Sequence, residues 1–135
     1  MGYLRYLECT NCRARYPADQ LHGLCARCGK VLFAHYDLER ARVEMRKDAL
    51  SGRDPTMWRY REVMPVEDPA NIMTLGEGMT PLLPLPGVAR RLGLRHVLVK
   101  EEGLNPTGSF KARGLSAAVS KAKELGVRVA DYQLG

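Results

Sequence analysis

The sequence has no apolar run that approaches about eighteen residues, and its N-terminus lacks the apolar core of a signal peptide. These absences argue against a membrane-spanning helix and a secreted protein, so we expect a cytoplasmic protein. A content of 45% hydrophobic and 27% charged residues is typical of a soluble globular protein. A chain of 135 residues supports one domain with a modest core, and it is short for two domains.

Positive charge is not concentrated in one part of the chain, although the net charge is +6. Residues 1–35 hold five Lys and Arg against two Asp and Glu, residues 36–62 hold seven against six, and residues 63–135 hold nine against seven. Nucleic-acid binding proteins usually gather their excess on one segment or face. The charge distribution therefore makes nucleic acid an unlikely partner.

All four cysteines lie in two pairs near the N-terminus, Cys9-x2-Cys12 and Cys25-x2-Cys28. Twelve residues separate the pairs, which is the pattern of a zinc ribbon with a closed, tetrahedral and structural site. Gly29 supplies the backbone freedom that the second turn needs. A disulfide framework is disfavoured in the cytoplasm, and iron is a less favoured occupant than zinc. His22 and His35 could each replace a thiolate, but we expect them on the surface because four cysteines complete the shell.

The remaining chain divides into a connecting segment, residues 36–66, and a partial α/β domain, residues 67–135, after a zinc-ribbon module in residues 1–35. In the connecting segment, Leu38, Ala41, Met45 and Ala49 recur at helical spacing, with Asp37 as the expected N-cap and Gly52 as the expected stop. Trp58 is expected to anchor a packed aromatic stretch over residues 57–66.

The third segment alternates between strand and helix patterns. We expect strands at residues 82–85, 97–100 and from 127, a short helix over 88–92, and a longer helix that begins after Ser109. Such alternation predicts an α/β fold with a mostly parallel sheet covered by helices.

A lysine stands where a helix least favours one. Ser109 is the expected N-cap of a helix whose apolar face is Leu115, Ala118, Ala122 and Leu125, and Gly126 is its expected end. Lys111 and Arg113 then lie in the first turn, at the positive end of the helix dipole. This environment favours a neutral lysine amine, which can form a Schiff base with a substrate or with pyridoxal phosphate.

Two other interpretations of this stretch are weaker. Gly103 and Gly108 have the spacing of a P-loop, but Ser109 and Phe110 stand where that motif needs Lys and Ser or Thr. A solvated basic helix start is the other alternative, and the turn residues, the cap and the second cation count against it.

The lysine segment resembles the motif of the pyridoxal-phosphate dependent enzymes that share the tryptophan synthase β fold. It runs from Lys100-Glu101-Glu102 through Asn105-Pro106-Thr107-Gly108-Ser109-Phe110-Lys111, and within that group it is most similar to the threonine synthases. The upstream segments Gly76-Glu77-Gly78-Met79-Thr80-Pro81-Leu82 and Trp58-Arg59-Tyr60-Arg61 are similar to stretches that come earlier in that family. The resemblance extends from about Cys9 to Gly126, and some threonine synthases carry a similar N-terminal ribbon.

The resemblance implies conversion of O-phospho-L-homoserine to threonine and phosphate. It implies that Lys111 holds the cofactor and moves protons, that Phe110 packs beside the cofactor, and that Ser109 and, more weakly, Thr80 line the site. It also implies a second α/β domain and a homodimer. No Gly-rich loop that could hold the cofactor phosphate follows Lys111, so the chain is expected to be an N-terminal fragment that is inactive alone.

Two alternatives remain open at this point. A threonine or serine dehydratase, or a β-replacement enzyme, shares the lysine motif in looser form. A zinc-ribbon module that binds nucleic acid or a protein would instead use Arg5, Arg13, Arg15, Arg27 and Lys30, although the interleaved aromatic residues are sparse there.

Overall fold

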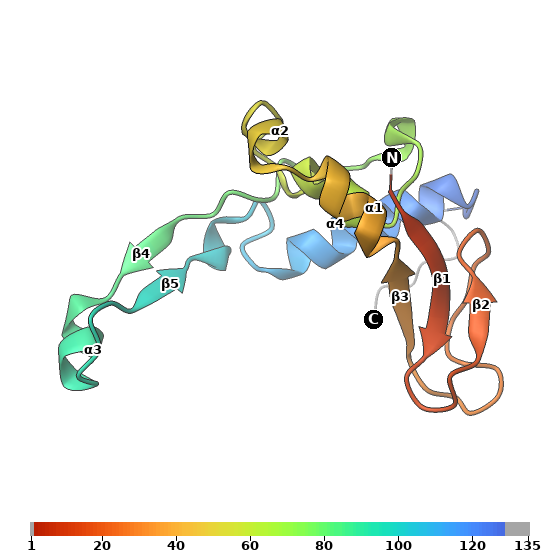
Figure 1. Cartoon of the computed structure of the whole chain (residues 1–135), viewed down its shortest axis with the longest axis horizontal. Coiled ribbons are helices and arrows are strands. Elements are labelled where there is room, and N and C mark those ends of the chain that lie inside the picture. The colour runs from red at the N-terminus through yellow and green to blue at the C-terminus, as the bar shows by residue number, and fades with distance from the viewer. Residues whose placement is uncertain (1, 129–135) are drawn as a thin grey trace.

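The structure is a computed structural model that describes residues 2–128 (Figure 1). A three-stranded antiparallel sheet forms one end of the molecule, with strands β1 (Leu4–Cys9), β2 (Arg15–Pro17) and β3 (Leu32–Tyr36) in the order β2-β1-β3. Leu7 of β1 pairs with Tyr16 on one side and with Ala34 on the other. The buried apolar residues that cluster at this sheet are Cys9, Ala14 and Cys25, so its apolar core is very small.

The helix expected over residues 38–49 forms as two pieces, α1 (Leu38–Glu44) and α2 (Lys47–Ser51). Asp37 caps α1 as predicted, because its Oδ1 accepts a hydrogen bond from the backbone N–H of Arg40 at 3.0 Å. Gly52 ends α2, also as predicted. The break at Met45 and Arg46 was not expected. Ala41 is the only buried residue of the two helices, so little tertiary packing favours one continuous helix.

The main core of the described residues lies between the connecting segment and the last helix. Met57 and Trp58 belong to the 3-10 helix η1 (Met57–Val63), and they pack with Val66 against Ile72 and Ala117. A second 3-10 helix, η2 (Pro69–Asn71), follows. Trp58 is 7% exposed, which confirms its predicted role as a packing anchor.

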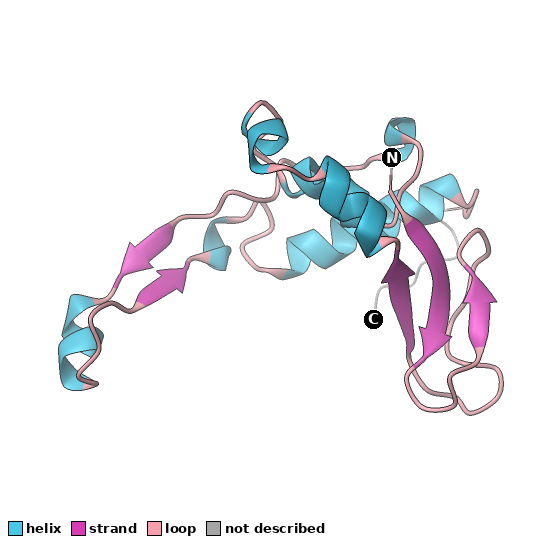
Figure 2. Ribbon diagram, in the orientation of Figure 1, coloured by secondary structure: helices cyan, strands magenta, loops and turns pink. Residues whose placement is uncertain are grey.

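An arm extends away from this core (Figure 2). It consists of β4 (Leu82–Pro84), α3 (Pro86–Arg91) and β5 (Leu98–Lys100), and the two strands pair antiparallel. The expected parallel arrangement is therefore wrong for these strands. Backbone hydrogen bonds from Leu85 to Val97 and from Glu101 to Pro81 extend the antiparallel ladder at both ends, and α3 closes its tip instead of covering a face. The strands are exposed because no described helix covers them.

The last described element is α4 (Lys111–Glu124), preceded by the 3-10 helix η3 (Glu102–Leu104). Gly126, at φ +71°, ends α4 as predicted, and the amides of Gly126 and Val127 bond to the carbonyls of Lys123 and Ala122. The expected strand from Val127 is absent at Val127 and Arg128, and Val129 lies outside the described residues. No helix within residues 2–128 has the length and apolarity needed to cross a membrane.

The buried face of α4 differs from the expected one. Ala112, Ser116, Ser120 and Ala122 are buried, whereas Leu115 and Ala118 are exposed. Small side chains let this helix lie close to the segment from Val66 to Met73. The serine hydroxyls then bond to that segment's backbone, with Ser116 Oγ donating to the Met73 carbonyl at 2.7 Å and Ser120 Oγ accepting from the Met73 amide at 2.8 Å.

Candidate functional site

The four cysteine sulfurs converge at the end of the three-stranded sheet, and all lie within 4.8 Å of one another. The Sγ atoms of Cys9 and Cys28 are 3.4 Å apart, and those of Cys12 and Cys25 are 3.5 Å apart. Four thiolates at about 2.3 Å from a tetrahedral zinc ion have sulfur separations of about 3.8 Å. The donor set and its spacing are therefore compatible with a four-thiolate metal centre.

The two cysteine pairs have the same backbone geometry. The amides of Arg13 and Gly29, each four residues after the first cysteine of a pair, bond to the carbonyls of Cys9 and Cys25. Both residues have positive φ, +60° for Arg13 and +68° for Gly29. The role predicted for Gly29 is confirmed, while Arg13 adopts this strained conformation without being glycine. The repeated turn directs the amides of Asn11 and Cys12 toward the Cys9 sulfur.

A tyrosine supports the second pair. The Tyr16 hydroxyl lies 3.1 Å from Cys25 Sγ and accepts a hydrogen bond from the Ala26 amide at 3.0 Å. The hydrogen bond with Tyr16 lowers the pKa of Cys25 to about 6, which favours the thiolate that a metal requires.

Neither nearby histidine joins the cysteine cluster. His22 lies with its Nε2 2.9 Å from the Pro17 carbonyl, and His35 stacks on Tyr6 with ring centroids 4.8 Å apart. Of the five basic residues considered for nucleic acid, Arg13 and Arg15 are paired with Glu8. These pairs reduce the positive charge that the ribbon could offer to a phosphate backbone.

Lys111 is the first residue of α4, and its side chain is exposed beside that of Phe110. The formal N-cap is Phe110, one residue later than expected, and it makes no side-chain cap bond. Ser109 nevertheless performs part of the predicted function, because its Oγ accepts from the Lys111 amide at 3.2 Å. Ser109, Phe110 and Lys111 thus form one exposed turn at the start of the helix.

Glu102 is the centre of a hydrogen-bonded network beneath this turn. Arg113 binds it in two places, with Nε 2.7 Å from Oε2 and Nη2 2.8 Å from Oε1. Thr80 Oγ1 donates to the same carboxylate at 2.5 Å, and Asn105 Nδ2 donates to it at 3.0 Å. These bonds, with Arg113 the strongest, hold the pKa of Glu102 far below its usual range, so the carboxylate stays ionised.

The same network connects three segments that are distant in sequence. Asn105 is 4% exposed, and its Oδ1 accepts from the Gly78 amide at 3.3 Å. Lys100 Nζ donates to the Thr80 carbonyl at 2.7 Å. Glu102 was noted in the sequence only as part of the lysine segment, and its position nine residues before Lys111 did not indicate a role for its carboxylate. Arg113, whose charge was expected to help favour a neutral Lys111 amine, is instead paired with the carboxylate of Glu102.

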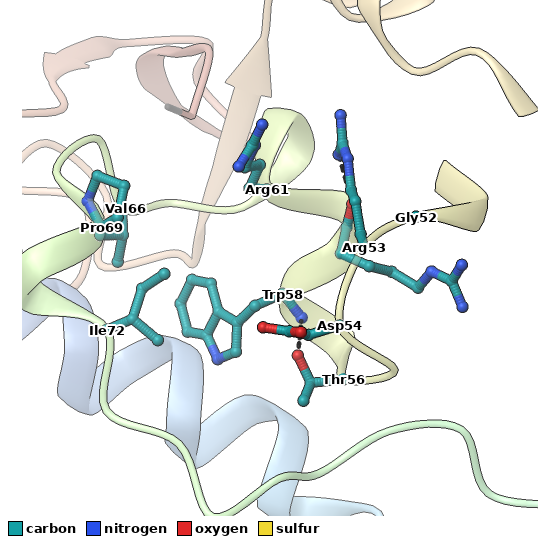
Figure 3. A pocket seen from close by; sticks show the side chains of 10 residues that line it. Gly52, Arg53, Asp54, Thr56, Trp58, Arg61, Val66, Pro69 and Ile72 are labelled. Atoms are coloured by element: carbon teal, nitrogen blue, oxygen red, sulfur yellow. Dashed lines mark hydrogen bonds between the residues drawn. The ribbon is translucent and has the colours of Figure 1, made fainter. Parts of the chain in front are cut away.

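The far end of α4 is also fixed. Glu124 Oε1 accepts from the amides of Glu67 and Asp68 at 2.8 and 2.9 Å, and Lys123 Nζ donates to the Ala70 carbonyl. The Trp58 indole N–H donates to Ser116 Oγ at 3.0 Å in the middle of the helix. The helix that begins with Lys111 is therefore bound to Trp58 of the connecting segment near its middle (Figure 3) and to residues 67–70 near its end.

Residues 73–132 match the family model described as pyridoxal-phosphate dependent enzyme, and the resemblance to that family is confirmed. The proteins to which this chain is similar include three threonine synthases from different organisms. That of Methanocaldococcus jannaschii is 40% identical over 122 residues, which are 90% of this chain and 30% of that protein. The threonine synthase of Methanosarcina acetivorans is 38% identical over 122 residues, which are 90% of this chain and 29% of that protein. The threonine synthase of Synechocystis is 54% identical over 70 residues, which are 51% of this chain and 18% of that protein.

This chain spans about three tenths of the length of the first two relatives. No solved structure matches it. The lysine turn fits the covalent attachment of pyridoxal phosphate, because it presents an exposed lysine at the start of a helix. The cysteine cluster fits zinc by its donor chemistry.

Proposed function

We propose that this chain carries the cofactor-binding lysine and the zinc ribbon of a threonine synthase-like enzyme. The observation that supports the proposal most strongly is the exposed lysine turn, held by the network around Glu102, within the segment that matches the family model. The reaction would convert O-phospho-L-homoserine to threonine and phosphate. The chain by itself would be inactive, since it spans only about three tenths of the length of the first two relatives.

Lys111 would hold pyridoxal phosphate covalently and transfer protons through Nζ. The cofactor, when bound, supplies an electron sink for carbanion chemistry. The exposed ring of Phe110 is free to pack beside the cofactor, and Ser109 can orient its hydroxyl proton toward the site while accepting from Lys111. Thr80 is the weakest member of the proposed site, because its hydroxyl already contacts Glu102 and Arg113.

The cysteine cluster would hold one structural zinc ion. Four thiolates complete a tetrahedral shell and leave no position for substrate. A metal is needed for stability because the ribbon buries few apolar side chains. A cytoplasmic location, a homodimer in the longer protein, and the division at residues 35 and 66 stay predictions.

The decisive experiment compares the 135-residue chain with a version extended to the length of the relatives. We expect pyridoxal phosphate to give a visible absorption band with the extended protein, and borohydride trapping followed by peptide mapping to place the label on Lys111. Lys111→Ala should lose the band, while Lys47→Ala, which changes an exposed lysine of α2, should keep it. Labelling at a different lysine contradicts the proposal.

The short chain and the products give two further outcomes. Tight, stoichiometric labelling of Lys111 in the 135-residue chain would show that it is not an incomplete site. Release of phosphate and threonine from O-phospho-L-homoserine supports a threonine synthase, whereas formation of ammonia and a 2-oxo acid from threonine supports a dehydratase.

A further inference from the structure

The two cysteine pairs are attached to the three-stranded sheet in different ways. Cys9 is the last residue of β1, and its sulfur accepts hydrogen bonds from the backbone amides of Asn11 and Cys12 at 3.4 and 3.5 Å. The second pair, which begins at Cys25, lies between β2 and β3 in a part of the chain that forms neither helix nor strand. Its position relative to the sheet therefore depends on side-chain contacts.

Tyr16 supplies these contacts from β2, where it pairs with Leu7 of β1. Its hydroxyl lies 3.1 Å from Cys25 Sγ and accepts a hydrogen bond from the Ala26 amide at 3.0 Å. Apart from contacts between cysteine sulfurs, both hydrogen bonds that join residues 25–28 to a strand in the described part of the chain use this hydroxyl. One hydroxyl thus contacts both the Cys25 side chain and the backbone that follows it.

The position of the hydroxyl is restrained by contacts of the Tyr16 ring. The ring is partly buried and packs against the cluster that Cys9 and Cys25 form. The imidazole of His22 meets it edge-on, with ring centroids 5.2 Å apart and an interplanar angle of 61°. His22 is in turn held by the Pro17 carbonyl, which lies 2.9 Å from its Nε2. These contacts keep the hydroxyl beside the second cysteine pair.

The direction of the hydrogen bonds follows from the chemistry of a metal ligand. A cysteine that binds a metal has no proton on its sulfur, so this sulfur can only accept. The Tyr16 oxygen accepts from the Ala26 amide, which leaves the hydroxyl proton for Cys25 Sγ. The bonds then run in one direction, from amide to hydroxyl to sulfur, and each polarises the next.

We propose that Tyr16 is a positioning residue of the metal centre, which holds Cys25 as a ligand and thereby slows the loss of zinc. The inference rests on the zinc site proposed above and adds to it a residue that is not a ligand. Groups that hydrogen-bond to metal ligands typically contribute about 10- to 100-fold to metal affinity. Because the hydroxyl contacts one of four sulfurs, we expect the lower end of this range.

The first test measures zinc affinity of the 135-residue chain by competition with a chromogenic chelator. Tyr16→Phe keeps the ring and removes the hydroxyl, so it should weaken zinc binding by about tenfold and speed the release of zinc to the chelator. Tyr6→Phe is the matched control, because Tyr6 is a tyrosine of the neighbouring strand whose ring stacks on His35. This control should leave zinc affinity unchanged. Equal zinc affinity of the Tyr16→Phe variant and the unmodified chain would overturn the proposal.

A spectroscopic test separates a hydrogen bond to the sulfur from a general effect on packing. Cobalt(II) replaces zinc, and the sulfur-to-cobalt charge-transfer absorption reports how strongly the thiolates donate electrons. A hydrogen bond withdraws electron density from the thiolate that accepts it. Tyr16→Phe should therefore shift this band to longer wavelength, whereas Tyr6→Phe should leave it in place. An unshifted band in the Tyr16→Phe variant contradicts the proposed bond.

A third measurement needs no variant, so it remains decisive if Tyr16→Phe fails to fold. Cadmium-113 replaces zinc in the unmodified chain, and the hydroxyl proton of Tyr16 is observed by NMR. A proton donated to a metal-bound sulfur shows a scalar coupling to the cadmium nucleus, and we expect this coupling for Tyr16. A hydroxyl proton without the coupling, or one that exchanges too fast to be observed, would refute the bond.

The outcomes also separate this inference from the zinc proposal itself. If the unmodified chain binds none of these metals through its cysteines, the zinc site fails and the role of Tyr16 fails with it. If the metals bind but the measurements on Tyr16 give the contrary results, only the role of Tyr16 is refuted. None of these measurements depends on Lys111 or on pyridoxal phosphate.

Discussion

The hydrogen bond between Trp58 and Ser116 should measurably connect the connecting segment to the lysine helix. Both residues are buried, with 7% and 9% exposure, and the indole N–H donates to Ser116 Oγ at 3.0 Å. Ser116→Ala leaves the indole N–H without an acceptor, which costs about 1–3 kcal/mol. The carbonyl of Met73, which also loses the Ser116 hydroxyl, keeps a longer bond from Ser120 at 3.3 Å.

Trp58→Phe removes the same bond in a different way. The lost hydrogen bond contributes about 1 kcal/mol, and a residual cavity of roughly 40 Å³ adds about 1 kcal/mol. We therefore expect about 2 kcal/mol of destabilisation for Trp58→Phe and about 1.5 kcal/mol for Ser116→Ala. The double variant should be less destabilised than the sum by about 1 kcal/mol, because one shared interaction is removed only once.

Urea unfolding followed by far-UV circular dichroism measures these differences, since Trp58 is the only tryptophan and its fluorescence is lost in one variant. Tyr60→Phe combined with Ser116→Ala is the control, because Tyr60 is exposed and its effect should add independently. Additivity within about 0.3 kcal/mol for Trp58 and Ser116 would refute the assignment of this bond as a stabilising contact.

Three further outcomes follow from other contacts. Elemental analysis should find one zinc per chain, and Cys25→Ser should release it and loosen residues 1–35 while the helix that follows Ser109 persists; less than half an equivalent in the unmodified protein contradicts this. The Arg53 guanidinium holds the pKa of Glu62 below its ordinary value of 4.5. The pair therefore stabilises the fold above pH 4.5, and this stabilisation is lost as the pH falls through the pKa that Glu62 has in the folded protein. Glu62→Gln should reduce the dependence of the free energy of unfolding on pH below 4.5. Glu102→Gln should speed amide hydrogen exchange across residues 105–113, and unchanged exchange would mean that the network does not fix the turn.

The features that the sequence predicted correctly depend on local rules. The convergence of the four cysteines follows from the paired spacing and from the turn geometry that each pair imposes. The ends of the helices follow from Asp37, Gly52 and Gly126, whose caps involve only neighbouring residues. Trp58 was predictable as an anchor because a large aromatic side chain in a short chain is usually buried.

The features that the sequence did not predict depend on what packs against each helix or strand. Ser116 and Ser120 define the buried face of α4, although periodicity favoured Leu115 and Ala118. Hydrophobic spacing cannot identify a face where small hydroxyl side chains bond to a neighbouring backbone, as they do at Met73. Strand direction was missed for a similar reason, since the apolar pattern of residues 97–100 is the same in either direction.

The hydrogen-bonded network around Glu102 changes how the two cations in the first turn of α4, Lys111 and Arg113, are interpreted. In the sequence, Lys111 and Arg113 both lie at the positive end of the helix dipole, and the two positions together were interpreted as the environment of a reactive lysine. The structure separates them, because Arg113 is compensated by Glu102 and so has a structural reason for its position. Lys111 forms no ion pair or side-chain hydrogen bond within residues 2–128, and its side chain is exposed rather than packed. The role proposed for the Lys111 amine therefore depends on its place at the start of α4 and on the segment that matches the family model, and no longer on Arg113.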